Sequence, residues 1–292
     1  MTRAARDGVL PVDKPVGPTS HDVVAAARRA LNERRVGHTG TLDPFASGLL
    51  LLCVGRATRI SEFLTGLDKS YLATARLGIA TDSEDREGEV VAESEGWRQV
   101  GPADLEAALQ GLTGRILQVP PRFSAKKVDG EAAHRRARRG EDVALDPRPV
   151  TVHELEVLDF QPPSLRFRIR CSSGTYVRSV ARDLGEALGV GAHLTELRRT
   201  AVGPFGVEGA LGLEELEQAD RVQSAWISPL EALAHLPRLE VDEPREGDLT
   251  HGRSVPAPGL PEGGPALAAR GSRLVAVGEV RHASFRPRKV FA

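Results

Sequence analysis

A short segment of strict alternation, SLRFRIRCS at residues 164–172, most constrains what this chain can fold into. Apolar side chains occupy every second position, and arginines occupy the positions between them. Successive side chains of a β-strand point to opposite faces of a sheet, so this pattern predicts a strand with one buried face and one charged face. Strands of this kind are typical of antiparallel sheets that are covered on one side only.

Other segments share this alternation or show helical spacing instead. Residues 70–79 and 150–160 alternate, and residues 8–15 (GVLPVDKP) predict a short strand that ends at a proline. Apolar residues recur at helical spacing elsewhere. This spacing predicts helices at 103–111, 176–188 and 213–222, and a helix from an N-cap at Ser20 to Leu31. The mixed order favours an α+β fold, with a mixed, largely antiparallel sheet and flanking helices, over a doubly wound parallel sheet.

The composition of the chain changes after residue 236. From residue 237 to residue 292 the sequence is rich in glycine and proline, and it holds short strand-like runs such as 273–280. A β unit of this size can fold when it docks onto a larger domain. We therefore predict two domains, a larger one at residues 1–236 and a small all-β domain at residues 237–292.

A near-neutral net charge hides a strong segregation of charged residues. The chain has 39 Lys and Arg against 40 Asp and Glu, a balance that on its own argues against a nucleic-acid partner. However, residues 122–139 hold seven bases and two acids, and residues 281–289 hold four bases and no acid. A basic run is also typical of a solvated helix face. Two separate runs nevertheless favour a polyanionic partner through their local positive field.

Cysteine spacing and hydropathy exclude several classes of protein. Cys53 and Cys171 lack CxxC or Cys/His spacing, so we expect buried, reduced thiols and neither a disulfide nor a zinc site. The first residues lack the apolar run of a signal peptide, and no stretch approaches the roughly 20 apolar residues of a membrane span. We expect a cytoplasmic protein without a membrane segment.

The strongest local motif is GHTGTLDP at residues 37–44. Asp43 is the only carboxylate in the glycine- and threonine-rich loop of residues 36–48, and loops concentrate residues that perform chemistry. Pro44 disfavours the helical region for Asp43 and holds its backbone extended. A simple Asp-Pro turn is the alternative interpretation. His38 has no second ligand at metal-binding spacing, so we expect no metal here.

Longer motifs relate the chain to a known family. They are GVLPVDKPVGPTSHDVV at 8–24, RRVGHTGTLDPFASGLLLLCVGRATR at 34–59, DKSYLATARLG at 68–78, QVPPRFSAKKVDG at 118–130 and CSSGTYVRSVARDLGEALGVGAHLTELRRT at 171–200. Through these motifs, which cover most of residues 8–205, the chain resembles the TruB family of tRNA pseudouridine synthases. Its last stretch, LVAVGEVRHASFRPRKVF, is similar to the end of the family's small PUA-like RNA-binding barrel.

The resemblance implies a fold, an activity and a partner. It implies the pseudouridine synthase fold and the isomerisation of uridine to pseudouridine at position 55 in the T loop of tRNA, with Asp43 as the nucleophile. A carboxylate can attack the sugar C1′ or move a proton without a metal or redox cofactor, and the residues leave open which of these it does. The target base must be flipped out of the folded RNA. The match to the stand-alone bacterial form implies a monomer that needs no guide RNA.

The resemblance also assigns substrate-binding positions. They are Lys14, Pro15, His38, Tyr71, Tyr176, Arg178 and Leu197. It implies that Tyr71 stacks on the flipped base, that Leu197 forms an apolar wall of the uracil pocket, and that His38 fills the gap left in the RNA. Taken alone, Leu197 is typical of a core residue. Tyr176 lies in the matching motif GTYVR, and Lys14 and Pro15 support the pocket.

The resemblance gives Arg178 a specific partner. It implies that this arginine pairs with Asp43 and keeps it ionised, since an opposite charge lowers the pKa of a carboxylate. Without the family, Arg178 would be interpreted as an arginine on the surface of a helix.

Six residues of the basic segment are predicted to contact RNA. They are Arg122, Lys126, Lys127, His134, Arg135 and Arg136. The chain departs from the family here, because His134 and Phe123 stand where the family usually carries tyrosine. This departure concerns the RNA contacts and not the chemistry, since a histidine can still stack or donate a hydrogen bond.

Two other function classes compete with this interpretation. An RNA-binding or RNA-chaperone protein could keep the fold without the chemistry, and it would be recognised by the loss of Asp43, Tyr71 or Arg178, all of which are present. An aspartyl hydrolase would need a second acid near Asp43. Residues 36–59 supply none in sequence, which leaves acids from distant segments.

Overall fold

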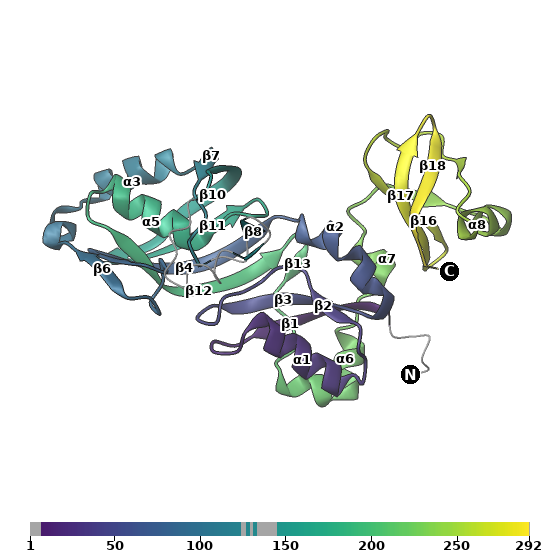
Figure 1. Cartoon of the computed structure of the whole chain (residues 1–292), viewed down its shortest axis with the longest axis horizontal. Helices are drawn as coiled ribbons and strands as arrows, with labels where there is room; N and C mark the ends of the chain where they lie inside the picture. The colour runs from purple at the N-terminus through teal and green to yellow at the C-terminus, as the bar shows by residue number, and fades with distance from the viewer. Residues whose placement is uncertain (1–6, 124–126, 129–130, 133–144, 292) are drawn as a thin grey trace.

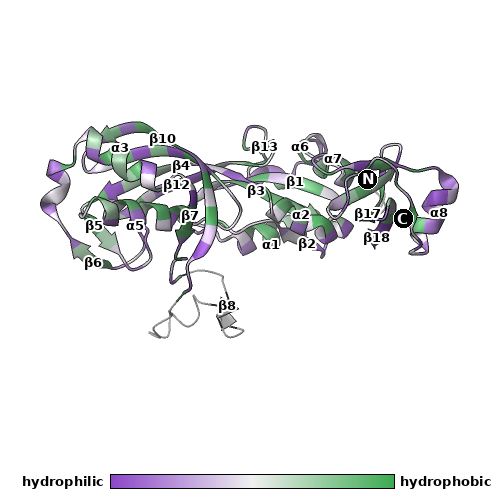
Figure 2. Ribbon diagram, turned by 90° about the horizontal axis from the view of Figure 1, so that it is seen from above, coloured by the Kyte–Doolittle hydropathy of each residue, from purple (hydrophilic) through white to green (hydrophobic). Residues whose placement is uncertain are grey.

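The computed structural model describes residues 7–123, 127–128, 131–132 and 145–291. Within these residues the chain forms three units that follow one another along the long axis of the molecule (Figure 1). The first two are built on one long sheet, and the third is the separate C-terminal sheet. The view in Figure 2 places β4, β10 and β12 at one end of the long sheet and β1 and β3 towards the C-terminal sheet.

The long sheet confirms the predicted mixed, largely antiparallel topology. Its path is β1 (Gly8–Lys14), β3 (Ser47–Val54), β12 (Ala192–Val202), β4 (Lys69–Leu77), β11 (Ser164–Cys171), β10 (Arg148–Gln161) and β7 (Gly114–Gln118), with β2 (Val36–His38) beside β3 and β13 (Phe205–Gly206) beside β12. All neighbouring strands are antiparallel except β3 and β12, which run parallel over two residue pairs. Further short elements lie outside this sheet. They are β5 (Ile79–Thr81) with β6 (Val90–Glu93), β8 (Lys127–Val128) with β9 (Glu131–Ala132), and the 3-10 turns Gly55–Ile60 and Glu95–Gln99.

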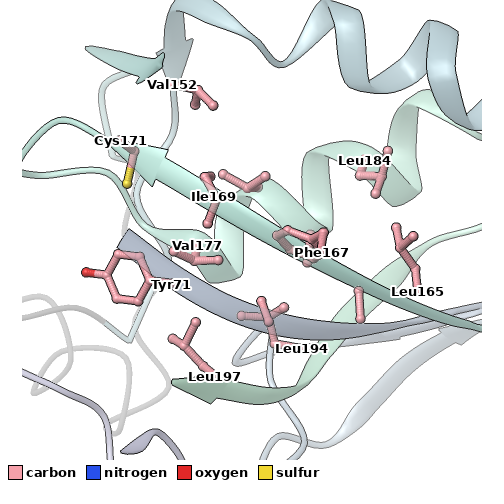
Figure 3. Packing of buried hydrophobic residues seen from close by; sticks show 14 of the residues in the cluster. Tyr71, Val152, Leu165, Phe167, Ile169, Cys171, Val177, Leu184, Leu194 and Leu197 are labelled. Carbon is pink, nitrogen blue, oxygen red and sulfur yellow. The ribbon is translucent and has the colours of Figure 1, made fainter. Parts of the chain in front are cut away.

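The alternating segment forms β11 as predicted. Leu165, Phe167, Ile169 and Cys171 are buried, and the three arginines between them are exposed. The buried face packs against α5 (Val177–Ala187) and α3 (Pro102–Gly111), which cover one face of the sheet (Figure 3). Burying a side chain of this size stabilises the fold by about 1.5–3 kcal/mol. Both helices begin and end within one residue of their predicted bounds.

The strand β3 shows why SGLLLLCV does not alternate. Leu49, Leu51 and Cys53 pack on one side, towards α2 (Ser61–Thr65) and α7 (Pro229–Ala232). Leu50 and Leu52 pack on the other side, against α1 (Ser20–Ala30) and α6 (Ala219–Ser224). A strand that is covered on both faces is apolar at every position. This buried strand anchors the end of the loop that contains Asp43.

Two predicted helices differ from the structure. Thr19, and not Ser20, is the N-cap of α1: its hydroxyl accepts a hydrogen bond from the Asp22 backbone N–H at 3.1 Å, and Asp22 closes a capping box. Ser20 is instead buried as the first residue of the helix. The segment predicted at 213–222 is a 3-10 turn, Glu214–Glu217, followed by α6, because Gln218 between them has an extended backbone.

The C-terminal unit is not all-β, contrary to prediction. Its curled sheet has the order β14 (Arg238–Glu240), β16 (Pro265–Arg270), β17 (Arg273–Arg281), β18 (Ser284–Val290) and β15 (Val255–Pro256), and it carries the helix α8 (Glu243–Thr250). The helix is capped by Asp242 and buries only Glu246 and Leu249. So few buried positions give no helical period, which is why the sequence pattern did not indicate a helix.

The C-terminal sheet uses its two faces differently. One face encloses a core of its own, with Leu239, Leu249 and Phe285 among its members. The other face, with Leu267 and Val277, joins the apolar cluster around α2 and α7. The unit therefore has its own core and also docks onto the larger one.

Most of the basic run at 281–289 is neutralised by acids. Arg281 and Arg288 each pair with Glu279, at 2.8 Å and 2.7 Å, and Lys289 pairs with Glu62 next to α2. Arg286 is the one cation of this run without an ion pair among the described residues. The run therefore contributes less to a positive surface than its composition predicts. No helix in the described part of the chain is long and apolar enough to cross a membrane.

Candidate active site

A cavity of 510 Å³ opens where β4, β12, the N-terminus of α5 and the loop after β2 meet. The predicted residues Asp43, Tyr71, Tyr176, Arg178 and Leu197 all line it. They come from four segments that are far apart in the sequence, so the sheet topology brings them together. Phe123, which stands where the family usually carries tyrosine, also lines the cavity.

The loop that contains Asp43 is fastened on both sides of this residue. The Ser20 hydroxyl donates to the Leu42 carbonyl at 3.0 Å and accepts from the Leu42 backbone N–H at 2.8 Å. On the other side, the Pro44 carbonyl accepts from the Gly17 N–H at 2.8 Å. Leu42 and the residues after Pro44 are buried in the core. The carboxylate of Asp43 is therefore presented from a rigid loop, and Ser20 is a site residue that sequence reasoning interpreted only as a helix cap.

The predicted pair between Arg178 and Asp43 is present. The Arg178 Nε lies 3.0 Å from the Asp43 Oδ2, and the arginine side chain is only 5% exposed. It is thus a buried group and not the surface arginine that a helix pattern alone would suggest. Its Nη1 donates to the Ser83 carbonyl at 2.8 Å, and its Nη2 donates to the Phe123 carbonyl at 3.0 Å. These bonds fix the direction of the guanidinium.

Asp85 is a functional candidate that sequence reasoning missed. Its Oδ2 lies 3.4 Å from Arg178 Nη1, and it is buried. The Ser83 hydroxyl and the Glu87 N–H donate to its other oxygen at 2.6 Å and 3.0 Å. The neighbouring Glu84 accepts from the Ser179 hydroxyl at 2.8 Å. The acidic segment 82–95 therefore turns two of its acids inward, against the first turns of α5.

Asp85 is also the distant acid that an aspartyl hydrolase would require. However, Asp43 and Asp85 bind two different nitrogens of one guanidinium. The two carboxylates therefore contact the arginine from separate positions, whereas the two acids of a hydrolase dyad contact each other and share one proton. The geometry does not favour the hydrolase.

Burial determines the protonation behaviour of Asp43. Burial raises the pKa of the Asp43 carboxyl above its ordinary value, and the Asp85 charge acts in the same direction. Arg178 and Lys14 oppose this rise in pKa without cancelling it. Arg178 lowers the pKa of Asp43 as expected, but the loss of hydration outweighs the ion pair and the net pKa is raised. A carboxylate with a raised pKa is a stronger base and nucleophile.

Tyr71 and Leu197 form the apolar part of the cavity. Figure 3 shows them together at the edge of the buried cluster, with the Tyr71 hydroxyl pointing away from the cluster. Burial raises the pKa of the Tyr71 phenol, while Arg199 lowers it by its charge and a side-chain hydrogen bond. Tyr71 is thus a neutral phenol at neutral pH. Its ring and the Leu197 side chain offer an apolar surface to a planar base.

The N-terminus of α5 brings Tyr176 to the cavity. Its backbone N–H donates to the Gln118 Oε1 at 2.8 Å, and its carbonyl accepts from the Gln118 Nε2 at 3.1 Å. Gln118 is buried at the end of β7. This pair of bonds sets where α5 begins, and therefore where Arg178, the second residue of the helix, can point.

Lys14, Pro15 and His38 lie outside the residues that line the cavity. Lys14 is fully buried and its Nζ donates to the Pro15 and Pro18 carbonyls at 2.8 Å each, and to the Pro44 carbonyl at 3.5 Å. Burial lowers the pKa of Lys14 to about 8. Pro15 is exposed, and it contributes its backbone carbonyl, which accepts the hydrogen bond from Lys14. This lysine thus contacts the carbonyl of the residue that follows Asp43, from the side away from the cavity lining.

His38 lies at the end of β2, at the start of the loop. Its Nδ1 accepts from the Gly40 backbone N–H at 3.3 Å, and its ring packs edge-on against His21 with centroids 5.8 Å apart. Burial lowers the pKa of His38, and His21 and Arg199 act in the same direction. The His38 ring is therefore neutral at neutral pH and partly exposed.

Four of the six predicted RNA contacts, Lys126, His134, Arg135 and Arg136, lie outside the described residues. Arg122 is exposed, four residues beyond β7 and next to Phe123. Lys127 belongs to β8, of which the structure describes the backbone. The basic segment thus begins at the cavity.

Two further buried cations line the cavity and were not predicted. Lys69 donates to the Thr65 and Leu67 carbonyls at 2.5 Å and 2.6 Å, and burial lowers its pKa to about 8. Arg199 lies on β12, two residues beyond Leu197. Both belong to motifs that carry the family resemblance, DKSYLA and ELRRT, which is the only signal that could have identified them. Cys53 and Cys171 are buried, as expected, and among the described residues no three His, Cys, Asp or Glu side chains gather to hold a metal.

Comparison with known families places the site in context. Residues 28–177 match the family described as TruB family pseudouridylate synthase (N terminal domain), and residues 178–234 match the tRNA pseudouridylate synthase B C-terminal domain. Relatives named tRNA pseudouridine synthase B include one from Thermobifida fusca, 47% identical over 98% of this chain and 99% of the relative. Another, from Geobacillus thermodenitrificans, is 43% identical with the same coverage.

Solved structures show the same fold. The structure described as a Cbf5-Nop10-Gar1 complex matches with a TM-score of 0.77 and 29% identity, and covers 98% of this chain and 85% of that one. An H/ACA RNP bound to a substrate RNA containing 2′-deoxyuridine matches with a TM-score of 0.76 and 28% identity, over the same shares of the two chains.

Proposed function

This chain belongs to the TruB family of pseudouridylate synthases, and from that premise we propose that it converts uridine 55 in the T loop of tRNA to pseudouridine. It is a pseudouridine synthase, and the relatives that match nearly its whole length act on tRNA by name. One observation of this chain carries the proposal further. Asp43 is the one carboxylate among the described residues that line the cavity, and Arg178 holds it at 3.0 Å.

We propose Asp43 as the nucleophile. The reaction breaks the bond between uracil N1 and the sugar C1′, turns the base, and forms a bond between C5 and C1′. The C5 proton is lost and N1 gains a proton, so the product is an isomer of the substrate. Attack of the Asp43 carboxylate on C1′ would hold the sugar while the base turns; proton abstraction by the same carboxylate is the alternative. The reaction is redox-neutral, so we propose that it needs no metal or redox cofactor.

The cavity explains why the base must leave the RNA stack. Tyr71 is buried and Asp43 lies with it in the wall of the cavity, so a base within a folded T loop would reach them by flipping out. The flipped uracil would then lie between the Tyr71 ring and the Leu197 side chain. Stacking of a base on an aromatic ring contributes about 1–3 kcal/mol, which offsets part of the cost of unstacking.

Arg178 holds the carboxylate ready for reaction. One nitrogen binds Asp43, while Asp85 and two backbone carbonyls satisfy the rest of the guanidinium. The carboxylate therefore keeps its orientation before the substrate arrives. Such preorganisation removes the need for rearrangement during the chemical step.

We propose that tRNA contacts extend from the cavity to the basic segment. Arg122 marks its start, and Lys126, Lys127, His134, Arg135 and Arg136 would neutralise phosphates of the T arm. The C-terminal unit at residues 237–292 would serve as a PUA-like RNA-binding domain. We propose a cytoplasmic, stand-alone monomer without guide RNA, because the relatives named for tRNA match 98% of this chain and 99% of their own length.

The assignment of position 55 is tested with purified protein and an unmodified tRNA transcript. After incubation, chemical mapping should find pseudouridine at position 55 and nowhere else. A transcript with cytidine at position 55 serves as the control and should remain unmodified. Pseudouridine elsewhere would overturn the assigned position, and no pseudouridine at all would favour the RNA-chaperone alternative.

A further inference from the structure

Arg199 is a buried arginine in the cavity wall with an unusual set of partners. It is 2% exposed, and its guanidinium reaches backbone carbonyls of two different segments. The Nε donates to the Leu49 carbonyl of β3 at 2.7 Å. The Nη2 donates to the Gly40 carbonyl at 3.1 Å, and the Nη1 contacts the Thr41 carbonyl at 3.5 Å. Gly40 and Thr41 belong to the loop that carries Asp43, so Arg199 ties this loop to the sheet.

The same guanidinium also reaches Tyr71. Arg199 and Tyr71 are directly opposite in the antiparallel pairing of β12 with β4. Both side chains line the cavity as cross-strand neighbours on one face of the sheet, and the charge of Arg199 together with its hydrogen bonding lowers the pKa of the Tyr71 phenol. One side chain therefore contacts both the loop of Asp43 and the ring proposed to stack on the base.

The backbone is shaped to allow this contact. Gly48 of β3 lies opposite Arg199 in the parallel pairing of β3 with β12. It has φ +104°, and a Cβ at this position would lie 2.2 Å from the Arg199 carbonyl oxygen. Only glycine lets the two strands approach so closely. This approach sets Arg199 near the loop that precedes β3.

The charge of Arg199 has no acidic counter-ion in the part of the chain that the structure describes. A buried charge without a partner of opposite sign is costly. The adjacent Arg198 shows the ordinary solution, because it is partly exposed and pairs with Asp13 at 2.7 Å. The flat guanidinium of Arg199, with five donors in a fixed fork, is suited to bridging several acceptors at once.

We propose that Arg199 is a positioning residue that holds the Tyr71 hydroxyl and the Asp43 loop at a fixed separation. Arg199 would thereby fix the position of a base stacked on Tyr71 relative to the Asp43 carboxylate, which acts on the sugar. This inference rests on the proposed function. A purely structural arginine would instead only link β3 to β12 through the Leu49 carbonyl. Its replacement would lower stability and act independently of Tyr71.

A double-mutant cycle separates the two roles. The variants are Arg199→Lys, Tyr71→Phe and their combination, with Arg198→Lys as the matched control. Single-turnover rates of pseudouridine formation and the Kd for tRNA are measured for each. Arg199→Lys keeps the charge but loses the fork, so we expect a roughly 10- to 100-fold lower rate, typical of a misplacement of about 1 Å. The Kd should stay within about twofold of wild type.

The coupling to Tyr71 decides the question. In the Tyr71→Phe background, where the hydroxyl is gone, Arg199→Lys should lower the rate by a clearly smaller factor than in wild type. The proposal would be overturned if Arg199→Lys lowered the rate by the same factor in both backgrounds, or if Arg199→Lys alone had the wild-type rate. Arg199→Gln, which keeps one donor group, replaces the lysine variant in the cycle if the latter does not fold. Absence of pseudouridine with the wild-type protein would instead refute the proposed function, before any variant is compared.

Discussion

Arg178 and Asp43 meet at 3.0 Å although they lie 135 positions apart in the numbering, because the first turn of α5 points at the loop between β2 and β3. Arg178 does not act alone. Asp85 binds the same guanidinium at 3.4 Å from a third segment of the chain. The orientation of the Asp43 carboxylate therefore depends on a residue that does not line the cavity.

We expect Asp85→Ala to lower the rate of pseudouridine formation by roughly 10- to 100-fold, because Arg178 would lose one of the two acids that fix its direction. The Kd for tRNA should change little, since Asp85 is buried away from the cavity surface. Glu93→Gln is the matched control, as Glu93 belongs to the same acidic segment but is exposed on β6. A wild-type rate in the Asp85 variant would show that Arg178 holds Asp43 without it.

The raised pKa of Asp43 predicts an effect of pH on stability. A carboxyl that is harder to ionise in the folded state than in the unfolded state lowers the stability of the fold at pH values at which it is ionised. This cost is absent below the ordinary pKa of 3.8, and it is complete above the raised pKa of Asp43 in the folded protein. Urea unfolding of wild type and Asp43→Asn should therefore show wild type losing stability relative to the variant as pH rises through this window. A constant difference across the window would contradict the raised pKa.

Lys14 predicts the opposite kind of pH window. Burial lowers the pKa of Lys14 from 10.5 to about 8, so the folded protein is destabilised by its charge below about pH 8. Between about pH 8 and 10.5 the folded lysine is neutral while the unfolded one is still charged, and stability rises with pH. Urea unfolding of wild type and Lys14→Met should show wild type gaining relative to the variant over this range. Lys69 has a similar pKa, but it is present in both proteins and its contribution cancels.

Binding of tRNA should weaken as salt concentration rises, because lysine and arginine side chains release counter-ions from the phosphates they contact. Replacing Lys126 and Lys127 by glutamine should reduce the slope of log affinity against log salt by about one unit for each lost contact. The matched control is Arg98→Gln, which removes an exposed cation of the turn Glu95–Gln99, outside both basic runs. An unchanged slope in the Lys126/Lys127 variant would show that this segment is not the tRNA surface.

Local patterns predicted the sheet better than the helix ends. Alternation found β11 because burial on one face leaves a period of two in the sequence. The N-cap of α1 was placed one residue late, because Ser20 and Thr19 are both good caps in sequence. A long-range contact distinguishes the two residues, because the Ser20 hydroxyl forms its hydrogen bonds with the Leu42 backbone.

The site could be predicted only where residues carry a family motif. Asp43, Tyr71 and Arg178 lie in such motifs, and the fold brings all three to one cavity. Asp85 gave no signal beyond its acidic run, because its partner lies 93 positions away in the numbering. The net direction of the Asp43 pKa was also out of reach, since it depends on burial in the folded chain.

Asp43 is the residue proposed to perform the chemistry, and a single substitution tests this role. Asp43→Asn keeps the size of the side chain and removes its nucleophilic charge, while Asp159→Asn changes an exposed aspartate of β10 as the matched control. We expect Asp43→Asn to bind tRNA with wild-type affinity and to form no pseudouridine at position 55 in a single-turnover assay, whereas Asp159→Asn is fully active. Pseudouridine formation by Asp43→Asn at a rate near that of wild type would contradict this role.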